Sequence, residues 1–189
     1  MPFVKSVYGF FFDTIQTFIL AGAIFLVLYA FILRPFQVSG ESMHPTYKDH
    51  EYILTNIVGL KFGELKRGDV IVFKAPTDPD KDFIKRVMAL PGDTISVSKG
   101  EVYVNNKKLN EAFYLSNSVR TPEGSFLREG EVVKVPTDHV FVMGDNRQFS
   151  SDSREWGFLN EKDIIGKSFF VYWPLNASRI EKNPFNRYR

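Results

Sequence analysis

The sequence lacks cysteine altogether and contains only three histidines in 189 residues. Without cysteine the chain can form no disulfide bond, no catalytic thiol and no metal site with cysteine ligands. His44, His50 and His139 stand in polar, turn-rich segments, a setting typical of solvated surface residues. No histidine cluster accompanies the carboxylates and no calcium-loop spacing occurs, so we expect neither a metal ion nor another cofactor.

The chain also lacks an excess of charge of either sign, since 24 Lys and Arg stand against 22 Asp and Glu, for a net charge of +2. The basic residues are scattered among acidic ones and form no stripe for a nucleic acid. With 44% hydrophobic residues, the chain has room for a membrane anchor and one compact domain. We therefore expect no nucleic-acid partner, and we also expect a monomer.

Residues 18–33 form an apolar run without charge or proline, and its apolar character extends back to residues 10–12 across Asp13 and Gln16. A helix needs about 20 apolar residues, at about 1.5 Å each, to cross a bilayer. A cleaved secretory signal peptide is the alternative, but the RPFQ segment that follows lacks the small residues of a cleavage site. Residues 1–34 are therefore predicted to form a short tail and a single uncleaved transmembrane helix.

After the anchor, short apolar runs alternate with turn signals, which is typical of an all-β domain, here over residues 35–175. Residues 94–98 and 101–104 alternate polar and apolar side chains around a Lys-Gly turn and predict a hairpin. Residues 106–131 predict a less regular excursion, and residues 176–189 a polar, basic tail. Further strands are expected at residues 70–73, 83–90, 131–135, 140–143 and 165–173.

Ser42 lies in the segment GESMHPT, residues 40–46, directly after the anchor. Glycine, serine, proline and threonine are also ordinary turn residues, so the segment by itself is compatible with a purely structural turn. A serine hydroxyl becomes a good nucleophile only when a neighbouring base takes its proton. A neutral lysine is one of the known bases for this purpose.

Lys85 is the lysine best suited to act as that base. On a strand it shares a face with Phe83, Val87 and Ala89. Burial among such apolar side chains lowers the pKa of a lysine from its usual value of about 10.4. The alternative interpretation is an edge-strand lysine that blocks aggregation. The presence of Ser42 in the same chain favours the base.

Three segments in this order, GESMHPT at 40–46, DFIKRVMALPGD at 82–93 and GDNRQFSSDSR at 144–154, resemble the type I signal peptidases. RGDV at 67–70 and a closing Trp173-Pro174 extend the resemblance over nearly the whole chain. It implies a mainly β fold, with an antiparallel β catalytic domain of signal-peptidase type after one N-terminal transmembrane helix. It also implies a membrane-bound serine endopeptidase that removes N-terminal signal peptides from exported preproteins.

By the same resemblance, Ser42 corresponds to the nucleophile and Lys85 to the general base of a Ser-Lys dyad. The backbone amide of Ser42 is expected to donate to the oxyanion of the tetrahedral intermediate. Some family members add a serine hydroxyl from the position that Gly40 occupies here, so the second oxyanion donor stays open. The resemblance to glycine-bearing members implies that Gly40 belongs to the oxyanion hole, where it allows a close backbone approach and an amide or a water molecule replaces the hydroxyl. Ser150 matches the serine that orients the lysine.

The remaining charges near residue 150 are expected to be structural, because carboxylates and arginines form bidentate bridges that hold a loop in shape. The resemblance implies that Asp145 pairs with Arg86 and Asp152 with Arg154. Signal peptides carry small residues before the scissile bond, which requires shallow apolar pockets. By position in the family, the pocket residues are Phe36, Val38, Met43, Phe83 and Ile84.

The positive charges near the anchor do not select an orientation, because Lys5 precedes it while Arg34 and Lys48 follow. The resemblance implies a single-pass protein of the plasma membrane, with a cytoplasmic N-terminus and an extracytoplasmic catalytic domain. The lipid bilayer and the signal peptides of preproteins are then its partners. Two alternatives remain open, a Ser-Lys protease with a regulatory or self-cleaving role, and a membrane-anchored β module without catalytic activity.

Overall fold

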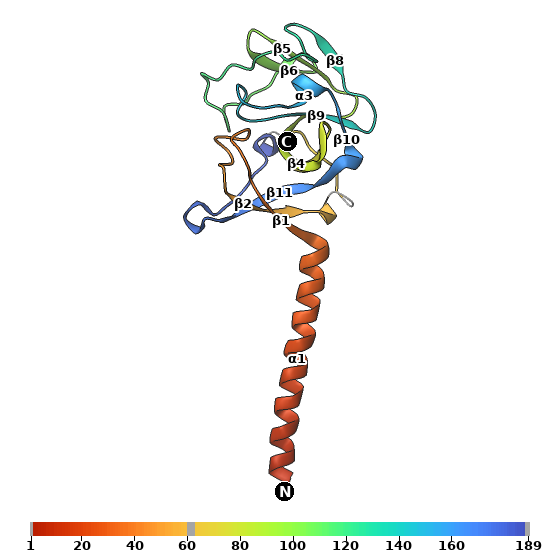
Figure 1. The fold of residues 1–189 in the computed structure, drawn as a ribbon, viewed down its shortest axis with the longest axis vertical. Coiled ribbons are helices and arrows are strands. Elements are labelled where there is room, and N and C mark those ends of the chain that lie inside the picture. The colour runs from red at the N-terminus through yellow and green to blue at the C-terminus, as the bar shows by residue number, and fades with distance from the viewer. Residues whose placement is uncertain (1, 60–62, 188–189) are drawn as a thin grey trace.

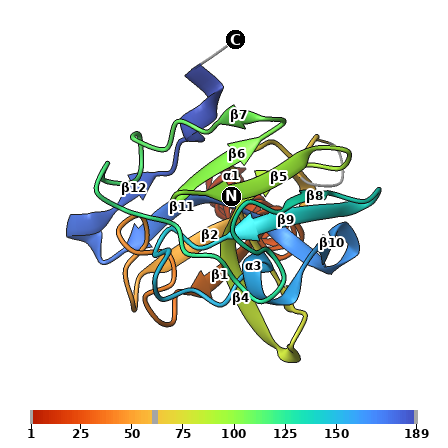
Figure 2. The same ribbon diagram turned by 90° about the horizontal axis from the view of Figure 1, so that it is seen from above.

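A single long helix projects from a β-rich domain (Figure 1). The structure, a computed structural model, describes residues 2–59 and 63–187. Helix α1 runs from Pro2 to Ile32. Seen along the helix, α1 lies beneath the domain, close to its centre (Figure 2). Strand β1 begins at Leu33, so the helix passes into the domain without an intervening loop.

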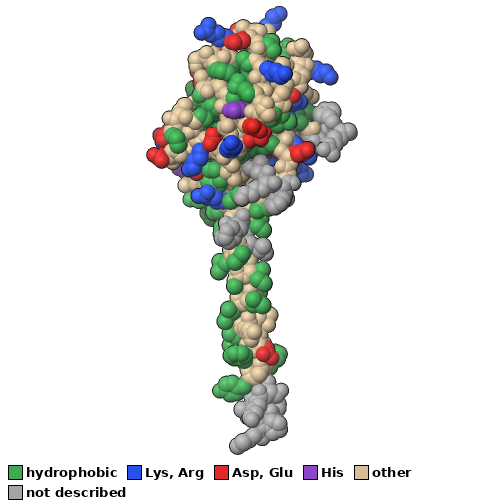
Figure 3. Space-filling model, turned by 90° about the vertical axis from the view of Figure 1, so that its right-hand side faces the viewer, with side chains coloured by type: hydrophobic (Ala, Val, Ile, Leu, Met, Phe, Trp, Pro, Cys, Tyr) green, Lys and Arg blue, Asp and Glu red, His purple; other side chains and the backbone are tan. Residues whose placement is uncertain are grey.

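The segment Val7–Val27 of α1 is long and apolar enough to cross a membrane, with a mean hydropathy of 1.9 and none of it buried. Apolar side chains lie along the visible face of helix α1 (Figure 3). The predicted N-terminal apolar helix is confirmed, and its apolar stretch includes residues 10–12, as expected from the sequence. The polar residues there do not interrupt it, because the hydroxyls of Thr14 and Thr17 donate to helix carbonyls one turn earlier, at 2.7 and 2.8 Å.

Two antiparallel sheets form the domain, which confirms the mainly antiparallel β class. In the large sheet the strands follow the order β1-β2-β11-β3-β4-β9-β10, and β12 also pairs with β11. In the small sheet the order is β7-β6-β5-β8. The bounds of the large sheet are β1 Leu33–Gln37, β2 Tyr52–Asn56, β3 Val70–Ala75, β4 Asp78–Ala89, β9 His139–Met143, β10 Leu159–Asn160, β11 Ile164–Trp173 and β12 Arg179–Ile180. Those of the small sheet are β5 Thr94–Ser98, β6 Glu101–Val104, β7 Lys107–Lys108 and β8 Val132–Lys134.

Short helices complete the fold, and their bounds are α3 Ser153–Trp156, η1 Glu161–Asp163, η2 Leu175–Ala177 and η3 Pro184–Arg187. The strands expected from the sequence are present, including the β5–β6 hairpin around Lys99 and Gly100. Strands β1 and β2 were not predicted from the sequence. Within the described part of residues 106–131, β7 is the one strand.

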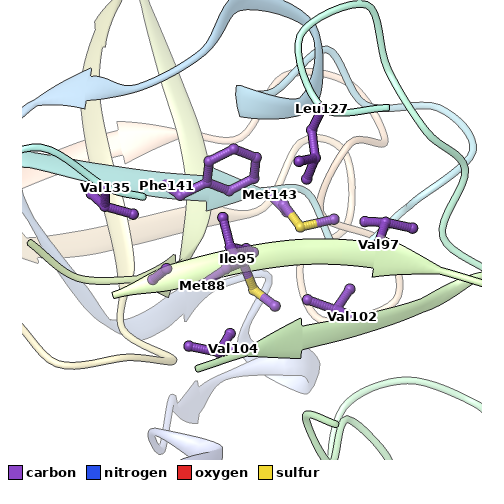
Figure 4. Packing of buried hydrophobic residues seen from close by; sticks show 10 residues of the cluster. Met88, Ile95, Val97, Val102, Val104, Leu127, Val135, Phe141 and Met143 are labelled. Carbon is purple, nitrogen blue, oxygen red and sulfur yellow. The ribbon is translucent and has the colours of Figure 1, made fainter. Parts of the chain in front are cut away.

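The core has three parts, and two of them lie on opposite faces of β3. Val70 and Val72 point into a cluster with Met43, while Ile71 and Phe73 point into another on the opposite face. Burial on both faces explains the continuous apolar run of this strand. The third cluster joins the small sheet to β4 and β9 through the residues labelled in Figure 4, which include Met88, Ile95, Val97, Val102, Val104, Leu127, Val135, Phe141 and Met143.

Candidate active site

Ser42 lies in a loop of residues 38–51, here called the Ser42 loop, which connects β1 to β2. Its two ends are joined by hydrogen bonds from the Val38 amide to the Glu51 carbonyl, at 2.8 Å, and from the His50 amide to the Val38 carbonyl, at 2.9 Å. Gly40 adopts a φ of +88°, a backbone conformation that favours glycine. The loop therefore has a closed base and a sharp bend just before Ser42.

Lys85 approaches Ser42 from strand β4. Its Nζ donates to Ser42 Oγ at 2.8 Å and to the Ile84 carbonyl at 3.0 Å, and it lies 5.1 Å from the centroid of the Phe83 ring. Lys85 is only 4% exposed. Strand β4 lies between β3 and β9. The interpretation of Lys85 as an edge-strand lysine is therefore wrong, because its strand is paired on both sides and its side chain is buried.

The protonation of Lys85 is shifted toward the neutral form. Burial lowers the pKa of Lys85 from 10.5 to about 8, although the nearby carboxylates of Asp152 and Asp145 act in the opposite direction. A substantial fraction of this amine is therefore neutral in slightly alkaline solution. A neutral amine at hydrogen-bonding distance can accept the proton of the Ser42 hydroxyl.

Asp145 and Arg86 form a buried ion pair next to Lys85. The Nε and Nη2 atoms of Arg86 donate to the two carboxylate oxygens of Asp145 at 2.8 and 2.6 Å, and both side chains are fully buried. Thr46 Oγ1 also donates to Asp145, at 2.5 Å, and Arg86 Nη1 donates to the Gly68 carbonyl, at 2.9 Å. Burial disfavours the charge on Arg86, but Asp145 outweighs this effect and the pKa of Arg86 is raised. This pair joins β4, the Ser42 loop and the segment after β9.

Asp152 and Arg154 form a second bidentate pair, with both nitrogen–oxygen distances at 2.8 Å. Asp152 also accepts from the Gly144 amide at 2.9 Å and caps the N-terminus of α3 by accepting from the Arg154 amide. The carboxylate thus fixes both ends of the segment from 144 to 154. Both Asp–Arg pairs that the resemblance implied are present in the structure.

Ser150 lies beside the site but does not bond to Lys85. Among the described residues its buried Oγ has no hydrogen-bond partner, and the acceptor that orients Lys85 is the Ile84 carbonyl. Ser150 packs against Gly144, where any added Cβ would collide with Ser150 Oγ and with the Ser42 carbonyl. The expected Ser150–Lys85 hydrogen bond is therefore absent from the described residues, because the Ser150 hydroxyl lies against Gly144.

The amide of Gly40 is not free to stabilise an oxyanion, because it donates to Asp49 Oδ1 at 2.8 Å. An added Cβ on Gly40 would meet no atom within 4 Å, so its φ rather than crowding accounts for glycine here. The amide of Ser42, by contrast, engages no hydrogen-bond acceptor among the described residues. The backbone amide of Asn146 supports the turn by donating to the Ser42 carbonyl at 3.0 Å.

A cleft of about 250 Å³ opens at Ser42 and Lys85. Four of the five expected pocket residues line it, namely Phe36, Val38, Phe83 and Ile84. Met43 does not line the cleft. It is fully buried in the core beneath the Ser42 loop, because the turn after Ser42 points its side chain inward. The other lining residues are Gln37, Ser39, Ile53, Val72, Asp82 and Ser151.

The sequence matches the family described as signal peptidase, peptidase S26, over residues 11–173. This chain belongs to the S26 signal peptidase family. It is 36% identical to Signal peptidase IB of Staphylococcus aureus strain MRSA252 over 177 residues, which cover 88% of this chain and 91% of that protein. It is also 36% identical to Signal peptidase I S of Bacillus subtilis strain 168 over 168 residues, which cover 87% and 90%.

Among solved structures, the crystal structure of a signal peptidase I from Enterococcus faecalis V583 is 27% identical to this S26 chain, with a TM-score of 0.46. The alignment covers 55% of this chain and 96% of the other. The stretch matched by the S26 family contains every residue of the site described above and ends before residue 174. Membership of the S26 family makes this chain a serine peptidase. Ser42 and Lys85 both lie inside the matched range.

Sequence reasoning missed two apolar residues of the S26 cleft, Ile53 and Val72. Ile53 lies opposite Phe36 in the β1–β2 pair, and Val72 lies opposite Ile84 in the β3–β4 pair. The two missed residues are therefore the cross-strand neighbours of Phe36 and Ile84, which were predicted to line the pocket. Val72 could have been found by pairing the predicted strands 70–73 and 83–90, whereas Ile53 required β2, which was not predicted.

Proposed function

We propose that this chain is a membrane-anchored serine endopeptidase that removes N-terminal signal peptides from exported preproteins. Ser42 is the nucleophile and Lys85 the general base. The observation that carries this proposal is the 2.8 Å hydrogen bond between a buried lysine amine and Ser42 Oγ. Two relatives that are 36% identical over most of the chain, and named signal peptidases, support the choice of substrate.

The reaction begins when neutral Lys85 takes the proton from Ser42 Oγ, which then attacks the scissile carbonyl carbon. The amide of Ser42 donates to the oxyanion that forms. Protonated Lys85 gives its proton to the departing amine, which leaves an ester between Ser42 and the signal peptide. A water molecule, deprotonated by Lys85, then attacks this ester and releases the second product.

The cleft favours an extended peptide with small side chains. Its apolar walls come from the four strands β1, β2, β3 and β4 and from the Ser42 loop, and its volume of about 250 Å³ accommodates small rather than bulky residues. β1 lies at the edge of the large sheet, where its free backbone groups can pair with an added strand. Small residues before the scissile bond are a property of signal-peptide cleavage sites, which fits this shape.

Helix α1 holds the enzyme at the bilayer in which signal peptides reside. The apolar segment Val7–Val27 supports this role. We place the N-terminus in the cytoplasm and the catalytic domain on the outer side of the plasma membrane, as exported substrates require. The protein acts as a monomer in this scheme, since Ser42 and Lys85 come from one chain.

The decisive experiment incubates the detergent-solubilised protein with a purified preprotein and sequences the new N-terminus of the product. We expect one cut directly after a small residue at the end of the signal peptide. Cleavage of the enzyme's own chain alone would instead support a regulatory or self-cleaving protease. If neither chain is cut while the preprotein is processed by another signal peptidase, the protein is a non-catalytic module.

The rate of cleavage is expected to rise with pH and level off above about pH 8. The lowered pKa of Lys85, about 8, sets this position, because only the neutral amine can accept the serine proton. The measurement is kcat/KM against pH for the wild type and for His44→Gln, His50→Gln and His139→Gln. The three variants should keep the wild-type profile, and a shifted or missing limb in any of them would mean that a histidine is the base.

Ser150→Ala is expected to reduce kcat by about fivefold to tenfold, the value of one hydrogen bond worth about 1 kcal/mol. Ser150 Oγ lacks a partner in the described residues, and catalytic hydrogen bonds often tighten only when substrate is bound. The melting temperature should stay near that of the wild type, because the substitution breaks no hydrogen bond in the free enzyme. An unchanged kcat would remove Ser150 from the mechanism.

A further inference from the structure

The C-terminal segment, residues 174–187, lies beyond the range that matches the family, yet it packs onto the catalytic domain. Strand β12 lies beside β11, with Arg179 opposite Val171 (Figure 2). The Glu181 amide donates to the Phe169 carbonyl at 2.8 Å. The sequence predicted a polar tail from residue 176 onward, and the described part of the segment contains the short helix η2, strand β12 and the short helix η3.

The side chain of Arg179 reaches the Ser42 loop. Its Nη1 and Nη2 atoms donate to the two carboxylate oxygens of Glu51 at 2.9 and 2.8 Å, and Nη2 also donates to the Thr46 carbonyl. Glu51 is only 2% exposed. The guanidinium lies 5.6 Å from the centroid of the Tyr47 ring. One arginine therefore binds two separate points in the second half of the loop.

Thr46 connects this contact to the catalytic centre. While its carbonyl accepts from Arg179, its hydroxyl donates to Asp145 at 2.5 Å and accepts from Arg86 Nη2 at 3.3 Å. Arg86 is the neighbour of Lys85 on β4. The residue held by Arg179 is thus also held by the ion pair next to the general base.

Thr46 and Ser42 belong to the same compact turn. The Tyr47 amide donates to the Met43 carbonyl at 2.9 Å, so the backbone between the two residues is folded rather than extended. A displacement of Thr46 therefore moves the serine as well. Catalysis is sensitive to such a shift, since misplacement by about 1 Å can cost about 10²-fold in rate.

We propose that Arg179 is a positioning residue that keeps Ser42 Oγ within hydrogen-bonding distance of Lys85 Nζ. The C-terminal segment then forms part of the working enzyme rather than a tail. The effect on turnover rests on the proposed function, whereas the effect on the Ser42 loop does not. A lysine would keep the charge but not the planar bidentate contact with Glu51.

The test compares Arg179→Gln, Arg179→Lys and the control Arg128→Gln in the full-length, detergent-solubilised protein. Arg128 is an exposed arginine whose side chain forms no hydrogen bond or ion pair among the described residues. We expect kcat to fall about 10²-fold in Arg179→Gln, with KM little changed, and less in Arg179→Lys. Arg128→Gln should behave like the wild type.

Because Arg179→Gln leaves Glu51 buried without its partner, the double variant Arg179→Gln/Glu51→Gln is measured beside it. The second substitution removes the unpaired charge and should recover much of the melting temperature. It does not restore the contact with the Thr46 carbonyl, so kcat should stay low. A kcat that recovers together with the melting temperature would overturn the proposal, because Arg179 would then serve stability alone.

Hydrogen exchange of the Ser42 loop provides a readout that does not depend on activity. Amides of the loop should exchange faster in Arg179→Gln than in the wild type, while amides of β4 should not. Unchanged loop exchange would overturn the inference whatever the activity. If the wild type cleaves no preprotein, the proposed function fails, and the exchange rates alone decide whether Arg179 holds the loop.

Discussion

Ser42→Ala is expected to lower kcat for preprotein cleavage by about four to six orders of magnitude, the loss seen when a serine nucleophile is removed. The hydroxyl supplies the oxygen atom that forms the acyl-enzyme. Neither a water molecule nor Lys85 can act as the nucleophile in its position. Its removal costs little packing, because Ser42 is a small, partly exposed residue in a turn. The melting temperature should therefore remain that of the wild type.

The control for this variant is Ser118→Ala, which removes an equally small hydroxyl at an exposed position away from the cleft. It should retain wild-type turnover. Both proteins are compared with the wild type by initial rates on one preprotein at a pH above 8, where Lys85 is mostly neutral. Substantial cleavage by Ser42→Ala would show that another residue is the nucleophile.

Asp145→Asn should reduce the free energy of unfolding by about 3–5 kcal/mol, the usual effect of removing one partner from a fully buried ion pair. The fully buried guanidinium of Arg86 loses both charged acceptors, and Thr46 Oγ1 loses the charge on the carboxylate to which it donates. Activity should decline as a consequence of this instability. Denaturant unfolding of the detergent-solubilised protein provides the measurement.

Asp78→Asn is the matched control, because Asp78 forms its ion pair with Lys81 at the surface. Exposed pairs contribute little to stability, so this variant should unfold like the wild type. One outcome for Asp145→Asn would contradict the proposed mechanism. If that variant unfolds like the wild type but has lost activity, the Asp145 carboxylate takes part in the chemistry, and the dyad needs a third member.

The strands of the domain were predictable where apolar runs are bounded by turn residues, as for β3, β4 and the β5–β6 hairpin. Strands β1 and β2 were not. β1 contains Pro35, which is a poor strand residue except at an edge, and it follows the helix without a turn signal. Its pairing with β2 is set by the loop that closes between Val38 and Glu51, a contact that the local sequence does not encode.

The candidate site was predictable in part, because its residues lie in short, distinctive segments. The burial of Lys85 follows from the apolar residues on its face of β4. The hydrogen bond from the Gly40 amide to Asp49 and the burial of the Met43 side chain in the core, away from the cleft, depend on the course of the Ser42 loop. Arg179 could not be found from its neighbours, since its partner Glu51 lies 128 residues away in sequence.

The direct passage from α1 into β1 leaves no linker between the apolar helix and the domain that carries Ser42. The helix ends at Ile32, its last carbonyl accepts from the Ile57 amide at 3.1 Å, and β1 starts at the next residue. The domain is therefore connected to the helix by a single peptide bond between secondary-structure elements and not by a loop. In the membrane-anchored protease proposed above, this direct connection would restrict cleavage to peptide bonds within a limited range of distances from the bilayer.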